Sequence, residues 1–203
     1  MQLCQAYLAY ARKASLPDPV MHLLQRSGAL QAAHSGRTLF DHLLGTYSLL
    51  EDWRQPTAVC LAGLFHSIYG TNAFQRQSLA PDQRPELQAA IGREAEALAW
   101  LFCAIDRPGA ILQALRKGQA DAELAARCDR AGLTRAPLCA TSQQIQALAE
   151  IETANLIEQG SWGSALRELY CTAIDRPGAL SASATAALRE GWARQLAEQE
   201  VNA

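Results

Sequence analysis

The chain has 203 residues, of which 49% are apolar and 19% charged, so it has enough apolar material for one folded core and too little charge for a disordered chain. Its net charge of −2 gives no sign of a basic nucleic-acid-binding surface. It contains no run of about 18 apolar residues, so we expect no membrane-spanning segment.

The sequence predicts an all-α fold. Ala, Leu, Gln, Glu and Arg are abundant, and the alternation of Val, Ile and Thr that is typical of strands is nearly absent. Between clusters of Pro and Gly, apolar residues recur at helical spacing. We expect helices over roughly residues 2–14, 19–32, 38–53, 56–68, 86–104, 109–129, 142–159, 163–174 and 182–199.

Two helix starts have capping-box spacing, Thr38 with Asp41 and Thr141 with Gln144. The longest predicted loop covers roughly residues 70–85, and a loop of that length in a small domain is often functional. We expect a single-domain helical bundle over residues 1–203. The motif-bearing core would cover about residues 30–160, with the C-terminal helices, about 161–203, packed on it.

One segment, Ala-Ile-Asp-Arg-Pro-Gly-Ala, occurs twice without change, at residues 104–110 and 173–179. One interpretation is a reused helix stop, because Pro and Gly both oppose continuation of a helix. The other is that Arg107 and Arg176 converge on one anionic ligand.

The six cysteines include no Cys-x-x-Cys pair, and Cys60 and Cys103 lie in apolar runs. We interpret all six as reduced thiols, which indicates a cytoplasmic protein. The first residues lack the early basic region of a signal peptide.

Two of the four histidines, His42 and His66, fall on neighbouring predicted helices, whereas His34 falls just before the first of them. The helix that ends near His66 is apolar on nearly every side, which predicts that it is buried. A buried imidazole needs a partner, since leaving it unpaired costs about 1–3 kcal/mol. That partner could be a neighbouring helix, or a metal ion shared with His42.

Other polar residues near this point are candidates for the same site. Tyr69 and Asn72 open the long loop after His66, and we expect them to contact substrate or take part in catalysis. On the predicted helix 142–159, Glu150 and Asn155 fall on the inward face, whereas Glu152 is expected to face solvent.

Residues 30–160 loosely resemble the HD-domain superfamily, in particular its branch of stringent-response nucleotide hydrolases. The matching segments are His34-Ser-Gly-Arg37, Asp41-His42-Leu43, Ala62-Gly-Leu-Phe-His66-Ser67, Ile91-Gly92 through Leu98-Ala-Trp-Leu101, and Leu148-Ala-Glu150. The string around His66 also resembles an uncharacterised family with a Leu-Phe-His-Ser-x-Tyr-Gly-Thr pattern.

The HD resemblance implies that His42 and His66 are metal ligands. The family's Asp after the second His is Ser67 here, and its Glu-Asp pair is replaced by Gly70-Thr71. The remaining carboxylates for the ligand set are Glu150 or Asp106. Two His and one carboxylate form a legitimate mononuclear site for Fe, Mn or Zn.

The resemblance therefore implies a metal-dependent hydrolase of a phosphoester or nucleotide-like molecule, with one divalent ion. The anionic small-molecule substrate would be held by His34, Arg37, Arg107 and Asn155. One alternative is a mononuclear non-haem iron oxygenase on the same ligands, and another is a non-catalytic ligand-binding helical domain. We expect no nucleic-acid or membrane partner, and a homo-oligomer stays open.

Overall fold

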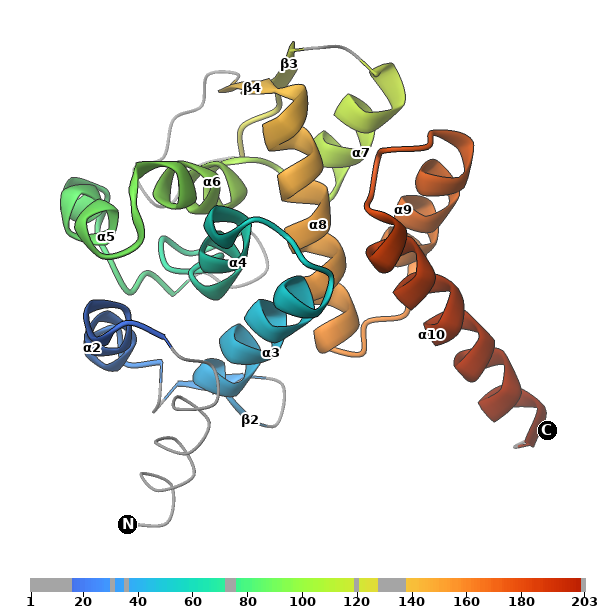
Figure 1. The fold of residues 1–203 in the computed structure, drawn as a ribbon, viewed down its shortest axis with the longest axis horizontal. Helices are drawn as coiled ribbons and strands as arrows, with labels where there is room; N and C mark the ends of the chain where they lie inside the picture. Colours follow the sequence, from blue (N-terminus) through green and yellow to red (C-terminus); the bar gives the residue numbers. More distant parts are fainter. Residues whose placement is uncertain are drawn as a thin grey trace.

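The computed structural model describes residues 16–29, 32–34, 37–71, 76–118, 121–127 and 138–201, and it is mainly α-helical in these ranges (Figure 1). The elements in chain order are α2 (Asp18–Arg26), β1 (Ala33–His34), β2 (Arg37–Thr38), α3 (Leu39–Asp52), α4 (Thr57–Leu64), the 3-10 turn η1 (Pro81–Gln83), α5 (Arg84–Ile91), α6 (Arg93–Ala104), α7 (Gly109–Lys117), β3 (Asp121–Leu124), β4 (Leu138–Thr141), α8 (Ser142–Glu158), α9 (Ser164–Asp175) and α10 (Ala182–Val201). The predicted all-α fold is confirmed only as a mainly helical one, because the short strands β1 to β4 were not predicted. The predicted helix 2–14 lies outside the described residues.

Helix α8 is the central element of the bundle, and it contacts α3, α4, α6, α7, α9 and α10 (Figure 1). Every residue from Ala147 to Asn155 on α8 is buried, so the helix has no solvent face over that stretch. This is why the predicted exposure of Glu152 is wrong: its side chain is buried on the crowded middle of α8. A central helix can carry buried polar side chains only if its neighbours supply partners.

Both predicted capping boxes are present. The Thr38 hydroxyl accepts from the Asp41 backbone N–H at 3.1 Å, and the Thr141 hydroxyl accepts from the Gln144 backbone N–H at 3.2 Å. In each box the third residue returns a bond to the backbone N–H of the cap. The starts of α3 and α8 were therefore encoded locally, as a capping box requires.

Two predicted helices are interrupted by glycines with positive φ. Gly92, with φ 87°, separates α5 from α6, which were predicted as one helix. Gly118, in the left-handed region, ends α7 at Lys117, where the predicted helix ran on to residue 129. The segment after Gly118 forms β3 instead, which pairs antiparallel with β4, with Asp121 opposite Thr141.

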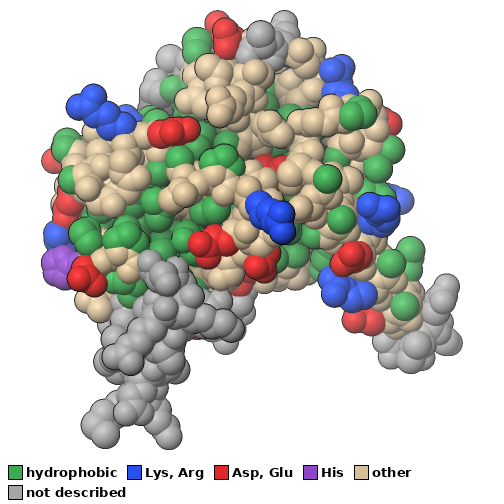
Figure 2. All heavy atoms as spheres, viewed as in Figure 1, with side chains coloured by type: hydrophobic (Ala, Val, Ile, Leu, Met, Phe, Trp, Pro, Cys, Tyr) green, Lys and Arg blue, Asp and Glu red, His purple; other side chains and the backbone are tan. Residues whose placement is uncertain are grey.

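Among the described residues, one cluster of buried apolar side chains extends from Leu16 to Leu188 and fills the space between these helices. Within the described ranges, none of the helices combines the length and apolarity needed to cross a bilayer. On the face drawn in Figure 2, basic and acidic side chains are interspersed and do not gather into one patch.

The two copies of the repeated segment both end a helix. The first begins at the end of α6 and leads into α7, and the second ends α9 at Asp175. Both copies of the segment therefore terminate a helix. The two arginines nevertheless differ, since Arg107 is buried and Arg176 is exposed.

Candidate functional site

His42 on α3 and His66, two residues after α4, face each other in the interior. Their Nε2 atoms are 3.2 Å apart, and their ring centroids are 5.0 Å apart with nearly perpendicular planes. Only 1% of His42 and 3% of His66 is exposed. The structure thus brings together the two imidazoles on which the sequence analysis concentrated.

His66 is oriented by the end of its own helix. Helix α4 ends at Leu64, and its last carbonyl groups lack helical donors. The Nδ1 atom of His66 lies 2.7 Å from the carbonyl oxygen of Gly63 and supplies one such donor. The His66 ring also makes an edge-to-face contact with Phe102, at 5.4 Å between ring centroids.

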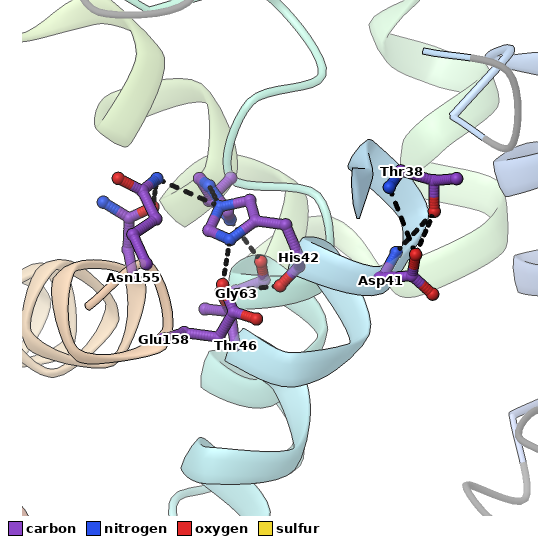
Figure 3. A network of polar contacts seen from close by, with 9 residues as sticks. Thr38, Asp41, His42, Thr46, Gly63, Asn155 and Glu158 are labelled. Carbon is purple, nitrogen blue, oxygen red and sulfur yellow. Dashed lines mark hydrogen bonds and ion pairs between the residues drawn. The ribbon is translucent and has the colours of Figure 1, made fainter. Parts of the chain in front are cut away.

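His42 is oriented from α8. Its Nδ1 atom contacts the carboxylate of Glu158, a buried side chain at the C-terminal end of that helix (Figure 3). Gly45, one turn after His42, makes room for this approach, because a Cβ atom there would collide with the Glu158 carboxylate. The close approach of α3 and α8 at Gly45 thus lets Glu158 fix the orientation of the His42 ring.

These contacts assign the ring protons. A carbonyl and a carboxylate accept hydrogen bonds, so Nδ1–H donates to Gly63 in one ring and to Glu158 in the other. Each Nε2 then presents a lone pair to the other ring. Two lone pairs at this separation repel unless a proton or a cation lies between them. The Glu158 carboxylate and the C-terminal end of α4 both favour positive charge at that point.

Two further residues contact this site from α8 and its C-terminal end, namely Asn155 in the helix and Gln159, the residue that caps it. The Gln159 amide Nε2 is 3.4 Å from Nε2 of His42, and it donates to Oδ1 of Asn155 at 3.1 Å. Asn155, predicted from the sequence, is therefore linked to His42 through Gln159. The sequence reasoning missed Glu158 and Gln159, although they follow Asn155 at the helical spacings i+3 and i+4 and could have been found from it.

Glu150 does not join the two histidines. Both of its carboxylate oxygens accept from Ser181, one from the backbone N–H and one at 3.2 Å from the hydroxyl, which places Glu150 at the start of α10. Burial raises the pKa of Glu150, and the bonds from Ser181 oppose that rise. Among the described residues, no three or more His, Cys, Asp or Glu side chains are grouped to hold a metal, so the predicted set completed by Glu150 or Asp106 is not formed.

Tyr69 belongs to a different polar cluster. Its hydroxyl donates to Glu96 at 2.9 Å, and Arg84 and Gln88 bind the same carboxylate. Burial and the neighbouring Glu96 raise the pKa of Tyr69. Burial alone would raise the pKa of Glu96, but the hydrogen bonds from Arg84, Gln88 and Tyr69 outweigh it and lower that pKa. The contacts described for Tyr69 give it a packing and hydrogen-bonding role.

Arg107 contacts the same phenylalanine ring as His66. Its guanidinium carbon is 3.9 Å from the centroid of Phe102, the ring that His66 contacts, and it forms a buried ion pair with Glu152. A buried charge needs such a partner. The predicted substrate-binding role of Arg107 therefore competes with a structural one, because Glu152 already holds the guanidinium.

The structure describes the other predicted site residues only in part. His34 and Arg37 are paired across the β1–β2 ladder, immediately before α3. Their side chains and the whole of Asn72 lie outside the described residues. Asp106 is exposed, and its carbonyl accepts the N–H of Ala110 in the first turn of α7.

Residues 23–107 match the model of a family described as a domain of unknown function (DUF6817), which is less than half of the chain. The matched segment contains both histidines and ends before α8, which contributes Glu158 and is followed by Gln159. No curated protein and no solved structure matches the chain. The resemblance to HD domains stays a prediction.

Proposed function

We propose that this protein is a metal-dependent hydrolase of small anionic esters, and that His42 and His66 bind one divalent ion through their Nε2 atoms. The observation that carries the proposal is the separation of 3.2 Å between these two atoms. Two nitrogen ligands of a tetrahedral zinc ion, each about 2.0–2.1 Å from the metal, lie about 3.3 Å apart. The imidazole pair thus has the spacing of two ligands of one ion.

The surroundings of the rings also fit a metal site. Ligand histidines usually donate their second ring N–H to a carboxylate or carbonyl, which fixes the ring and the tautomer. Glu158 does this for His42, and Gly63 does it for His66. The described residues supply two nitrogen donors. The Gln159 amide nitrogen lies beside Nε2 of His42 and also donates to Oδ1 of Asn155, so Gln159 borders the pair without supplying a ligand.

Each residue then has a stated role. A bound ion would lower the pKa of a water molecule and polarise an ester oxygen. Glu158 accepts the Nδ1–H of His42 and so keeps the lone pair of that ring on Nε2, facing His66. The carbonyl of Gly63 accepts the Nδ1–H of His66 in the same way, and Oδ1 of Asn155 accepts from the Gln159 amide.

A second candidate is a helical binding domain without catalysis, in which one proton shared between the two Nε2 atoms replaces the ion. The observation that favours it is the incomplete ligand group, since no three His, Cys, Asp or Glu side chains among the described residues are grouped to hold a metal, and Glu158 contacts Nδ1 of His42. In that state the positive charge of the proton is balanced by the Glu158 carboxylate.

Elemental analysis after chelation and reloading with Zn, Mn or Fe(II) separates these functions. We expect about one ion per chain in the wild type and in His22→Ala, an exposed histidine on α2 that serves as control. His66→Gln and His42→Gln should bind none while keeping their helical circular dichroism. Hydrolysis of bis-p-nitrophenyl phosphate should follow metal content.

Selective retention of iron, with oxygen consumption and no ester hydrolysis, would replace the hydrolase by an oxygenase. Metal content that is unchanged in both histidine variants would contradict a site at this pair. If the wild type binds no metal after reloading, a proton shared between the two Nε2 atoms explains the short distance between His42 and His66.

A further inference from the structure

A cleft of about 350 Å³ opens where the end of α7, the first turns of α8 and the connection between α9 and α10 meet. The volume is within the range of about 300–1,000 Å³ that is common for small-molecule sites. Its lining combines the apolar side chains of Leu115 and Ile145 with the amides of Gln143 and Gln146. Residues of the His42–His66 site are not part of this lining.

Arg176 supplies the one charged side chain among the lining residues. The ion pairs found between described residues do not include it. Asp175 beside it and Asp121, which pairs with Thr141 at the start of α8, do not line the cleft. The cleft therefore presents a guanidinium group without a competing carboxylate in its lining.

Gly118 places this guanidinium. The Nη1 atom of Arg176 lies 2.3 Å from the position that a Cβ atom of residue 118 would take, which is too close for both, so a side chain at 118 would make the guanidinium shift. Gly118 also has φ 60°, a conformation that L-residues rarely adopt. The glycine that ends α7 thus also allows Arg176 to lie across the edge of the cleft.

The two copies of the repeated segment use the same arginine differently. In the first copy Arg107 is buried against Glu152, whereas in the second copy Arg176 is exposed and lines the cleft. Helix termination accounts for the Pro and Gly of both copies. It does not account for the second arginine, and the cleft offers a use for it.

We propose that this cleft binds a small molecule that carries one oxyanion group, phosphate or carboxylate, on a short apolar body. A guanidinium group binds both oxyanions through two parallel hydrogen bonds. The amides of Gln143 and Gln146 provide further donors, and Leu115 and Ile145 provide contact for the apolar body. The site is separate from the proposed metal site and does not depend on it.

The test titrates the full-length protein with phenyl phosphate, benzoate, inorganic phosphate and the neutral benzyl alcohol, followed by ¹H–¹⁵N NMR. We expect saturable shifts of Gly118 and of the Gln143 and Gln146 side-chain amides, strongest for an aromatic oxyanion and absent for benzyl alcohol. The better ligand between phenyl phosphate and benzoate identifies the oxyanion. Arg176→Gln should weaken binding roughly ten- to a hundredfold, as expected for the loss of charge-assisted hydrogen bonds.

Arg189→Gln, a change at an exposed arginine on α10 outside the lining, is the matched control and should bind as the wild type does. Gly118→Ala should weaken binding as well, because it displaces the guanidinium. His66→Gln should bind normally, which separates this site from the proposed metal site. Binding that is unchanged in Arg176→Gln, or shifts located at other residues, would overturn the proposal, as would the absence of saturable shifts in the wild type.

Discussion

His42 and His66 are 24 residues apart in the chain, and their Nε2 atoms lie 3.2 Å apart in the interior. The pair depends on contacts from outside the segment that contains it, because Glu158 of α8 orients His42. The site is thus assembled from three parts of the chain, namely α3, the end of α4 and the last turn of α8 (Figure 3).

Replacement of Glu158 tests whether α8 belongs to the metal site. Glu158→Gln removes the charge that supports His42, and we expect zinc affinity to fall about 10–100-fold with helical content unchanged. Gly45→Ala should have a similar effect, because its Cβ would displace the carboxylate. Competition with a chromogenic chelator measures the affinity. Glu168→Gln, in an exposed pair with Arg116, is the control, and equal affinity in all variants would refute this role.

The buried pair of Arg107 and Glu152 should behave as a structural ion pair. Arg107→Met leaves the Glu152 carboxylate buried without its partner and should lower the free energy of unfolding by about 3–5 kcal/mol. The double variant Arg107→Met, Glu152→Leu should recover most of that loss. Urea denaturation of the single and double variants measures the coupling. A double variant as unstable as the single one would show that Arg107 contributes mainly through its stacking on Phe102.

Glu96 should stabilise the fold at neutral pH and lose that effect in acid. Its pKa is lowered in the folded state, because the hydrogen bonds from Arg84, Gln88 and Tyr69 outweigh the effect of burial. The stabilisation is therefore fully present above the unfolded pKa of about 4.3 and is lost as the pH falls below it. Glu96→Gln should have a flatter stability profile between pH 3 and 6 in urea denaturation. A slope equal to that of the wild type would contradict this assignment.

Glu150 should have the opposite effect. Burial raises its pKa in the folded state, so its contribution is fully present below the unfolded pKa and is lost as the pH rises through the folded value. We expect the difference in unfolding free energy between wild type and Glu150→Gln to shrink as the pH rises from 4 to 7. The same titration with Glu168→Gln gives the background of an exposed glutamate. A difference that grows with pH would show that the bonds from Ser181 dominate.

Thiol reactivity should report the two cysteine environments. Burial raises the pKa of Cys103 to about 11 and that of Cys60 to about 12, and the thiolate is the reactive form. In a Cys4→Ser, Cys128→Ser background, a chromogenic disulfide reagent at pH 8 should modify the exposed Cys139 and Cys171 within minutes. The other two thiols should react only after unfolding. Fast modification of four thiols in the native protein would contradict this burial.

Local signals in the sequence were enough for the helical class and for several boundaries. The capping boxes at Thr38 and Thr141 form within one turn, so residue types at fixed spacing decide them. The burial of His66 also followed from an unbroken apolar helix. The positive φ of Gly92 and Gly118, and hence the breaks after α5 and α7, could not be read from a glycine alone, because glycine is also tolerated within helices.

Partners distant in sequence were decided only by the tertiary structure. Helical periodicity placed Glu150 and Asn155 inward, but it could not show that Glu150 reaches Ser181 whereas Glu158 reaches His42, 116 residues away. A seven-residue segment that occurs twice likewise gave one buried and one exposed arginine. The sequence determined which side chains need partners. Helix packing determined which partners they have, because that choice depends on contacts between segments whose relative position no local pattern records.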